Sequence, residues 1–350
     1  MLAPVTHLLP LATFRRNRLL PVNGHVLVRT GQKVNATDVI AEAQRDGQHF
    51  LIDIRRALNI SNIENAEKLI TRHVGEQVQK GDILALIGSV LPRVVRAPVD
   101  GEIVAINNGQ ILLEGKAAPF QLLAGFTGGV VEVIPDRGAV IEASGALIQG
   151  VWGNRRVNAG TLQVVTSAPD DEFLRTRLDM SMRGAVILAG YCANADALQM
   201  AGETVLRGLI LSSMNASLIP LANSLPFPVI LLEGFGRLAT NAAAFRILRT
   251  NEKRDICLNS AAWNSFTGDR PEVFIPLPAE GNPLSELAEI KPGKTVRVVT
   301  SPYASQVGVI LDVQPGWSAL PNGVRARTAT VRLDNNEQVR IPLANLDVLE

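Results

Sequence analysis

The stretch HVGEQVQKGDILALIG (His73–Gly88) sets the pattern of the first half of the chain. Apolar and polar residues alternate between glycines, and a period of two is that of a β-strand with one buried face. Gly75 and Gly81 suit corners that need positive φ, and Val78 between them is predicted to point inward. Similar alternation runs over residues 20–165, so we expect short antiparallel strands there, in a barrel or sandwich of repeated hairpins.

The repeated hairpin pattern has one imperfect copy and one interruption. The segment Gly31–Ile40 echoes the hairpin, with Thr37 where the second glycine would stand. Asn59–His73 interrupts the alternation, and because Asn and Ser are residues that cap helices, we expect a helical turn or two there.

Two motifs of this region resemble the barrel-sandwich hybrid of biotinyl and lipoyl carrier domains, a fold also found in Rnf and Nqr electron-transport subunits and in membrane-fusion adaptors. They are the G-x-x-V-x-x-G hairpin Gly75–Asp82 and the A-P-x-x-G start of a strand at Ala97–Ile103. The resemblance implies this fold for residues 20–165. A carrier also needs a lysine at its modification turn, but Lys80 lies in the preceding hairpin and the turn at Asn107–Gly109 has none. We therefore expect no bound cofactor.

The middle of the chain, residues 172–270, changes to continuously apolar runs separated by amphipathic stretches. The runs are GAVILAG (184–190), RGLILSS (207–213), FPVILLEG (227–234) and RDICLNS (254–260). Such runs are typical of parallel strands with both faces buried, so the sequence predicts a small α/β domain with a parallel sheet.

Three further segments complete the expected organisation. Residues 1–19 are interpreted as a solvated lead-in, because Arg15, Arg16 and Arg18 follow the apolar part and a signal peptide has the opposite order. Residues 271–292, rich in proline and glycine, are interpreted as a linker. Residues 293–350 alternate again, with a hairpin predicted at Asp334–Asn336. The predicted fold class is a multidomain α/β plus all-β protein that ends in an SH3-like barrel.

The C-terminal segment resembles a KOW-type module, as found in NusG-type transcription elongation factors and in several ribosomal proteins. The matching residues are Val296–Val298, Ser301–Ala304, Gln306–Ile310 and Ile341–Leu346. The resemblance implies contact with a protein partner or with RNA. The candidate contact residues are Arg297, Tyr303, Gln306, Gly308, Trp317, Arg325 and Arg327. Asp312, Asp334, Glu337, Asp347 and Glu350 offset much of the positive charge, which favours a protein partner over RNA or the ribosome.

The α/β segment contains one sequence typical of phosphate binding, GFGRLA (Gly234–Ala239), between a strand and a helix. Glu233 precedes it and would repel phosphate, so we interpret the sequence as a structural turn. The carboxyl ends of the predicted strands nevertheless offer weak candidates for a small-anion or nucleotide site. They are Ser212, Ser213, Asn215, Gly234 and Gly236.

The amino-acid composition disfavours several classes of function. The chain has 34 basic and 33 acidic residues and 4% aromatic residues, so it has no overall attraction for nucleic acid. Cys192 and Cys257 are expected to be buried rather than nucleophilic, and the four histidines lack metal-ligand spacing. No apolar run reaches the roughly 18 residues of a membrane span, and a cytoplasmic location is expected.

These observations favour a non-catalytic scaffold or adaptor that binds partner macromolecules through its β modules, with an unknown oligomeric state. One alternative is a factor associated with RNA, the ribosome or RNA polymerase through the KOW-like module. A second alternative is a regulatory subunit that binds a small anion or nucleotide in the α/β domain.

Overall fold

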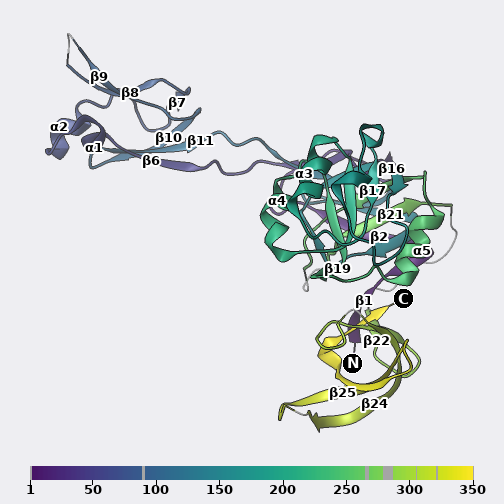
Figure 1. Cartoon of the computed structure of the whole chain (residues 1–350). Helices are drawn as coiled ribbons and strands as arrows, with labels where there is room; N and C mark the ends of the chain where they lie inside the picture. The colour runs from purple at the N-terminus through teal and green to yellow at the C-terminus, as the bar shows by residue number, and fades with distance from the viewer. Residues whose placement is uncertain are drawn as a thin grey trace. The chain divides into compact units, whose positions relative to one another are not determined.

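The computed structural model describes residues 2–88, 91–264, 268–278, 287–304, 306–320 and 322–349. The chain divides into two compact units (Figure 1). The main unit consists of Met1–Leu19, Val26–Ile40 and Leu123–Glu350, and the inserted unit of Leu20–His25 and Ala41–Leu122. The β-rich region expected over residues 20–165 is therefore divided between them, because its first and last strands pair within the large sheet of the main unit.

The inserted unit is mostly antiparallel sheet. One sheet has the order β6 (His49–Asp53), β11 (Gln110–Gly115), β10 (Gly101–Asn107), β7 (Gln77–Val78), and a second pairs β8 (Ile83–Ile87) with β9 (Arg93–Arg96). Val78 is buried in the core between them, as its place in the hairpin predicts. Other members of that core are Leu84, Ile103 and Leu113.

Two short helices follow β6, and side-chain caps explain where they begin. α1 (Ile54–Leu58) starts after Asp53, which accepts a hydrogen bond from the Arg56 amide at 3.1 Å. α2 (Ile63–Glu67) starts after Asn62, which accepts from the Asn65 amide at 3.2 Å. Asx residues favour this position because their side chains satisfy amides of the first turn. The helical turn expected within residues 59–73 is thus confirmed.

The main unit is built on one large mixed sheet. Its order is β15 (Trp152–Gly153), β19 (Val229–Phe235), β18 (Gly208–Met214), β17 (Val186–Leu188), β16 (Val157–Val164), β20 (Asp255–Asn259), β21 (Glu272–Pro276), β14 (Gly138–Gln149), β13 (Gly128–Ile134), β4 (Lys33–Val34). Strands β16 to β19 are parallel, and the remaining pairs are antiparallel. A separate sheet has the order β12 (Phe120–Leu123), β5 (Val39–Ala43), β3 (His25–Val26).

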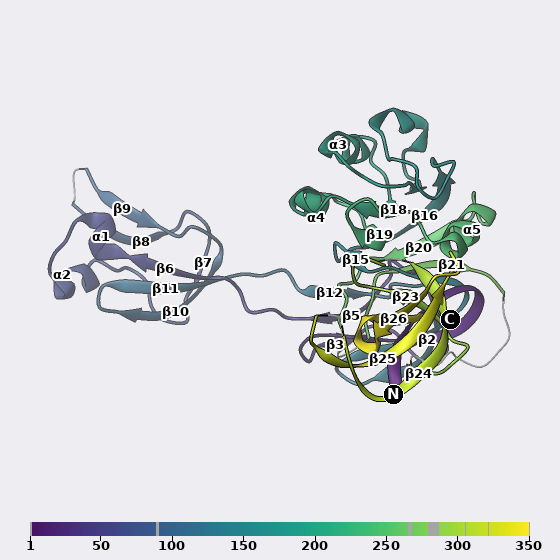
Figure 2. The same cartoon turned by 60° about the horizontal axis from the view of Figure 1, so that its bottom comes forward.

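Helices cover both faces of the parallel strands (Figure 2). α3 (Ala195–Glu203) and α4 (Ile219–Ser224) pack on one face, and α5 (Ala242–Thr250) packs on the other. Alternate residues of each strand therefore meet different helices, which explains the continuously apolar runs. The prediction for 184–190, 207–213 and 227–234 is confirmed. The fourth run is different, because β20 lies antiparallel to β16 rather than parallel to its predecessor.

Of the segment expected as a solvated lead-in, residues 2–6 and 8–19 form strands. β1 (Leu2–Thr6) pairs with β22 (Leu287–Glu289) and with β27 (Leu346–Leu349), and β2 (Leu8–Leu19) pairs with β14. Two of the three arginines that suggested a solvated segment have carboxylate partners on other strands, and Arg18 donates to the Leu123 carbonyl. Arg15 pairs with Glu142 at 2.8 Å, and Arg16 pairs with Glu272 at 2.6 Å.

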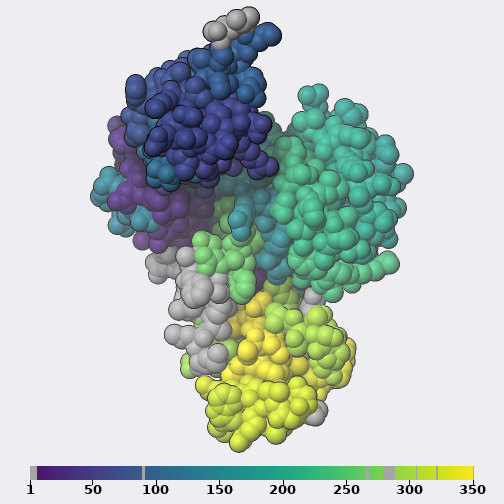
Figure 3. Space-filling model, turned by 90° about the vertical axis from the view of Figure 1, so that its left-hand side faces the viewer, coloured from purple at the N-terminus to yellow at the C-terminus, as the bar shows by residue number. Residues whose placement is uncertain are grey.

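The C-terminal strands form a second sheet of the main unit and pack into a compact body, drawn in yellow in Figure 3. The order is β22, β1, β27, β23 (Thr295–Val298), β24 (Val307–Ala319), β25 (Arg325–Leu333), β26 (Gln338–Pro342). The hairpin predicted at Asp334–Asn336 joins β25 to β26, and Asn336 has a φ of 66°.

The segment 271–292 is not simply a linker. β21 lies between β20 and β14 in the large sheet and is buried along most of its length, and β22 pairs with β1. Pro276 is tolerated because it is the last residue of its strand. The part of the expected linker at residues 279–286 lies outside the described residues. Across the described ranges, no helix has the length and apolar character needed to cross a membrane.

Candidate binding surfaces

The outer end of the β24–β25 hairpin carries an exposed aromatic and basic surface. β24 and β25 form a long ribbon (Figure 1), in which Trp317 lies opposite Arg327 and Ala319 lies opposite Arg325. Residues directly opposite each other in an antiparallel pair project to the same side. Trp317, Arg325 and Arg327 therefore share one side of the ribbon, which we call the hairpin face. Trp317 is 66% exposed.

The cations of the hairpin face have no partner within the described part of the chain. Neither the Arg325 nor the Arg327 side chain forms a hydrogen bond or an ion pair there. Two acids that were expected to offset this charge are engaged elsewhere. Glu337 accepts a hydrogen bond from the Tyr303 hydroxyl at 3.1 Å, and Asp347 pairs with Arg297.

Arg297 is not a surface residue, although the sequence suggested it as a contact. Its side chain is only 4% exposed and pairs with Glu233 at 3.1 Å and with Asp347 at 3.2 Å. Glu233 also accepts a hydrogen bond from the Asn241 amide at 2.8 Å. Burial raises the pKa of Glu233, and the neighbouring Arg297 guanidinium opposes that rise. Arg297 therefore connects β23 to the end of β19 and is not available to a partner.

Tyr303, Gln306 and Gly308 lie at the other end of β24 from the hairpin face. The Tyr303 ring packs on the C-terminal core, and its hydrogen bond to Glu337 raises the pKa of its hydroxyl. Gln306 is exposed, and its amide donates to the Tyr303 carbonyl at 3.0 Å. Gly308 has a packing role, because a Cβ there would lie 2.5 Å from the Arg332 carbonyl oxygen. The structure thus does not bring all seven predicted contact residues together.

Four of the five candidates at the carboxyl ends of β18 and β19 have structural roles, whereas the buried Ser212 hydroxyl has no hydrogen-bond partner among the described residues. The Ser213 hydroxyl bonds to the Leu238 amide and carbonyl at 3.0 and 2.9 Å. Asn215 caps the short helix η3 (Ala216–Leu218). Gly234 and Gly236 have φ values of 129° and 94°, as a strand-to-helix turn requires. Ser212 is fully buried. These contacts favour the structural interpretation of Gly234–Ala239.

A cavity of about 460 Å³ lies instead at the carboxyl end of β16, which pairs with β17 in the same sheet. Thr166 and Ser167 follow the strand, and Arg177 and Arg249 complete the polar lining. Sequence reasoning missed this cavity because its residues come from separate segments. The hydroxyl pair Thr166 and Ser167, shortly after the strand that ends in Val164, was the available signal.

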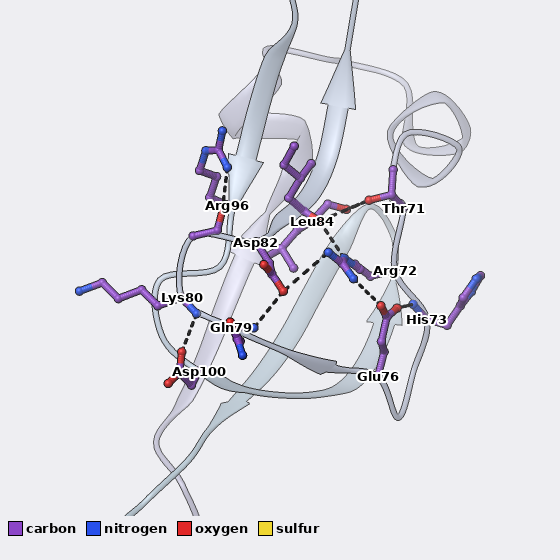
Figure 4. A network of polar contacts seen from close by, with 12 residues as sticks. Thr71, Arg72, His73, Glu76, Gln79, Lys80, Asp82, Leu84, Arg96 and Asp100 are labelled. Carbon is purple, nitrogen blue, oxygen red and sulfur yellow. Dashed lines mark hydrogen bonds and ion pairs between the residues drawn. The ribbon is translucent and has the colours of Figure 1, made fainter.

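The second glycine hairpin, in the inserted unit, is held by a polar network (Figure 4). Gly75 and Gly81 have φ values of 85° and 94°, as predicted. Asp82 accepts from the Gln79 amide at 3.0 Å, and Asp100 accepts from the Lys80 amide at 2.6 Å. The Lys80 side chain extends away from this network (Figure 4) and is exposed.

The remaining chemistry-bearing residues do not form a reactive centre among the described residues. Cys192 and Cys257 are buried, and burial raises the pKa of Cys192 to about 12 and also raises that of Cys257. Both thiols therefore stay protonated near neutral pH, which disfavours nucleophilic attack. Within those same ranges, no three His, Cys, Asp or Glu side chains are grouped to hold a metal ion.

Comparison with known proteins gives little further guidance. No protein-family model and no curated protein matches the chain. Among solved structures, it is similar to S-adenosylmethionine:2-dimethylmenaquinone methyltransferase from Geobacillus kaustophilus HTA426, with 15% identity over 37% of this chain and 88% of that one. The TM-score is 0.27, which is too low to assign a fold or a function.

Proposed function

We propose that the chain is a cytoplasmic, non-catalytic adaptor that binds a partner macromolecule through its β modules, and that the hairpin face is the contact for a protein partner. The observation that carries the proposal is the exposure of Trp317 beside Arg325 and Arg327. Tryptophan and arginine are the side chains most enriched among residues that dominate binding energy at protein interfaces. An exposed tryptophan flanked by two guanidiniums that have no partner among the described residues suits an acidic protein surface with an apolar pocket.

The division of the chain into modules supports the same function. The inserted unit has a hydrophobic core of its own, and the chain crosses between it and the main unit at four points. We propose that the inserted unit is a barrel-sandwich hybrid and that the C-terminal strands form a KOW-type, SH3-like barrel. The glycine hairpin Gly75–Asp82 supports the first assignment, and the β25–β26 hairpin supports the second. Modules of both kinds commonly bind other macromolecules.

RNA is the second candidate partner, and the same three residues favour it. A base can stack on the Trp317 indole while Arg325 and Arg327 neutralise phosphates. This would be the function of a factor associated with RNA, the ribosome or RNA polymerase.

Affinity purification of the full chain from native cells at about 0.1 and 0.5 M salt tests these proposals. A stoichiometric protein partner that survives nuclease treatment is expected for the adaptor. Nuclease-sensitive association that falls steeply with salt would indicate RNA instead. Repeated recovery of the bare chain under both conditions would contradict the adaptor function.

A further inference from the structure

The cavity at the end of β16 lies where the large sheet changes direction. β16 is parallel to β17 on one side and antiparallel to β20 on the other. The chain proceeds from β17 through α3 and α4 to β18 and β19, then returns through α5 to β20 beyond β16. In open sheets with parallel strands, ligands commonly bind beyond the carboxyl ends of the strands. The cavity lies at that edge of the parallel part of the sheet.

The lining itself is suited to an anion. Two guanidiniums, from Arg177 of η1 (Arg175–Arg177) and from Arg249 of α5, face a single lining carboxylate, Glu252. Arg249 donates to the Ser167 carbonyl at 2.9 Å, which fixes its side chain at the end of β16. Within the described ranges, the Arg177 side chain has no hydrogen bond or ion pair. Guanidinium groups bind phosphate and carboxylate oxygens in a planar, bidentate manner.

The turn after β16 that carries part of the lining is held by hydrogen bonds to Asp171. Asp171 accepts hydrogen bonds from the Ser167 and Ala168 amides at 2.7 and 3.2 Å. These amides and the Arg177 charge hold the pKa of Asp171 below its usual range. The carboxylate of Asp171 is thus used to close the turn, and Ser167 and Thr176 belong to the cavity lining.

We infer that this cavity binds a small phosphate-bearing metabolite, with Arg177 and Arg249 holding the phosphate. The volume of about 460 Å³ lies in the range of small-molecule sites and exceeds the size of a phosphate ion, so it leaves room for an organic body. The site is separate from the hairpin face, and the inference goes beyond the adaptor function.

Calorimetric titration of the full chain with glycerol 3-phosphate tests the inference, with succinate and sodium chloride at equal ionic strength as references. Saturable binding of the phosphate ester alone is expected. Arg177→Gln and Arg249→Gln should each weaken it at least tenfold, since a hydrogen bond to a charged group is worth about 1.5–3 kcal/mol. Arg246→Gln, on the same helix but outside the lining, should leave it unchanged.

Glu252→Gln provides a second test if an arginine variant fails to fold. It removes the negative charge of the lining and keeps both arginine donors. We expect it to bind glycerol 3-phosphate several-fold more tightly. Equal binding of succinate, heats that do not saturate, or unchanged affinity in folded Arg177→Gln and Glu252→Gln would overturn the inference. Trp317→Ala should bind the ester as the natural chain does, so the outcome is independent of the adaptor proposal.

Discussion

The glycine hairpin Gly31–Asp38 of the main unit and the hairpin Gly75–Asp82 of the inserted unit share the first corner and its hydrogen bonds but have opposite surroundings. The first glycine has a φ of 83° in one and 85° in the other, and its amide donates to a neighbouring strand at 2.7 Å in both. The final aspartate of each accepts a hydrogen bond from the amide three residues earlier, at 2.7 and 3.0 Å. The valine of each is buried.

The hairpins differ at one turn residue, which is Ala36 in the first hairpin and Lys80 in the second. Ala36 is fully buried and belongs to a cluster with Phe14, Phe126 and Phe274, whose rings meet edge to face. The matching residue of the second hairpin, Lys80, is exposed. The glycine and aspartate pattern therefore sets the backbone, and the turn residue decides whether the hairpin is part of a core or of a surface.

The largest effect on stability is expected when the turn residues Ala36 and Lys80 are exchanged. Ala36→Lys should destabilise the main unit by about 3–5 kcal/mol, because it places an unpaired charge in an aromatic core. Lys80→Ala should change stability by less than about 0.5 kcal/mol. Urea unfolding followed by Trp fluorescence measures the main unit. A small loss in Ala36→Lys would show that the two turns are not differently surrounded.

A medium effect is expected at the second corner of each turn. Gly81 has a φ of 94° and open space around its Cα, so Gly81→Ala should cost about 1–2 kcal/mol from backbone strain alone. Thr37 occupies the matching position without positive φ, and Thr37→Ala should be nearly neutral. Thermal unfolding of both variants measures this, and equal losses would contradict the conformational explanation.

The smallest effect is a difference in acid sensitivity. Arg72 and the His73 amide hold the pKa of Glu76 below its ordinary 4.5, whereas Gln32 makes the matching bond to the Arg29 amide. A carboxyl with a lowered pKa in the folded state stabilises it above the unfolded-state pKa, and this contribution is lost as pH falls through the folded-state value.

Hydrogen exchange at the His73 and Arg29 amides, corrected for intrinsic rates, measures this difference. Protection at His73 should decline from about pH 4.5 downward, and protection at Arg29 should not. Glu76→Gln should remove the decline. A decline that persists in Glu76→Gln would assign the acid sensitivity to another group.

The parts of the fold that the sequence predicted are those coded by neighbouring residues. Alternation between glycines identified the hairpins, and apolar runs identified β17, β18 and β19. Residues 1–19 were misinterpreted because their partners lie far along the chain. Arg16 looks solvated in the sequence, but its partner Glu272 is on β21.

The same reasoning explains the outcome for the candidate sites. Trp317, Arg325 and Arg327 come together because they lie close in sequence, on either side of the turn between β24 and β25. Arg297 looked equivalent, yet its carboxylate partners Glu233 and Asp347 come from two other strands. The residues that line the cavity beside β16 come from separate segments of the chain, so no local sequence pattern predicts that they lie together.

The hairpin face provides the most direct test of the adaptor function. Quantitative affinity purification from native cells should compare the natural chain with Trp317→Ala and Arg327→Ala, and with Arg332→Gln as a control on the same strand. We predict that the first two lose most of the bound partner at unchanged melting temperature, while Arg332→Gln retains it. Full recovery of the partner by Trp317→Ala and Arg327→Ala would contradict the proposal.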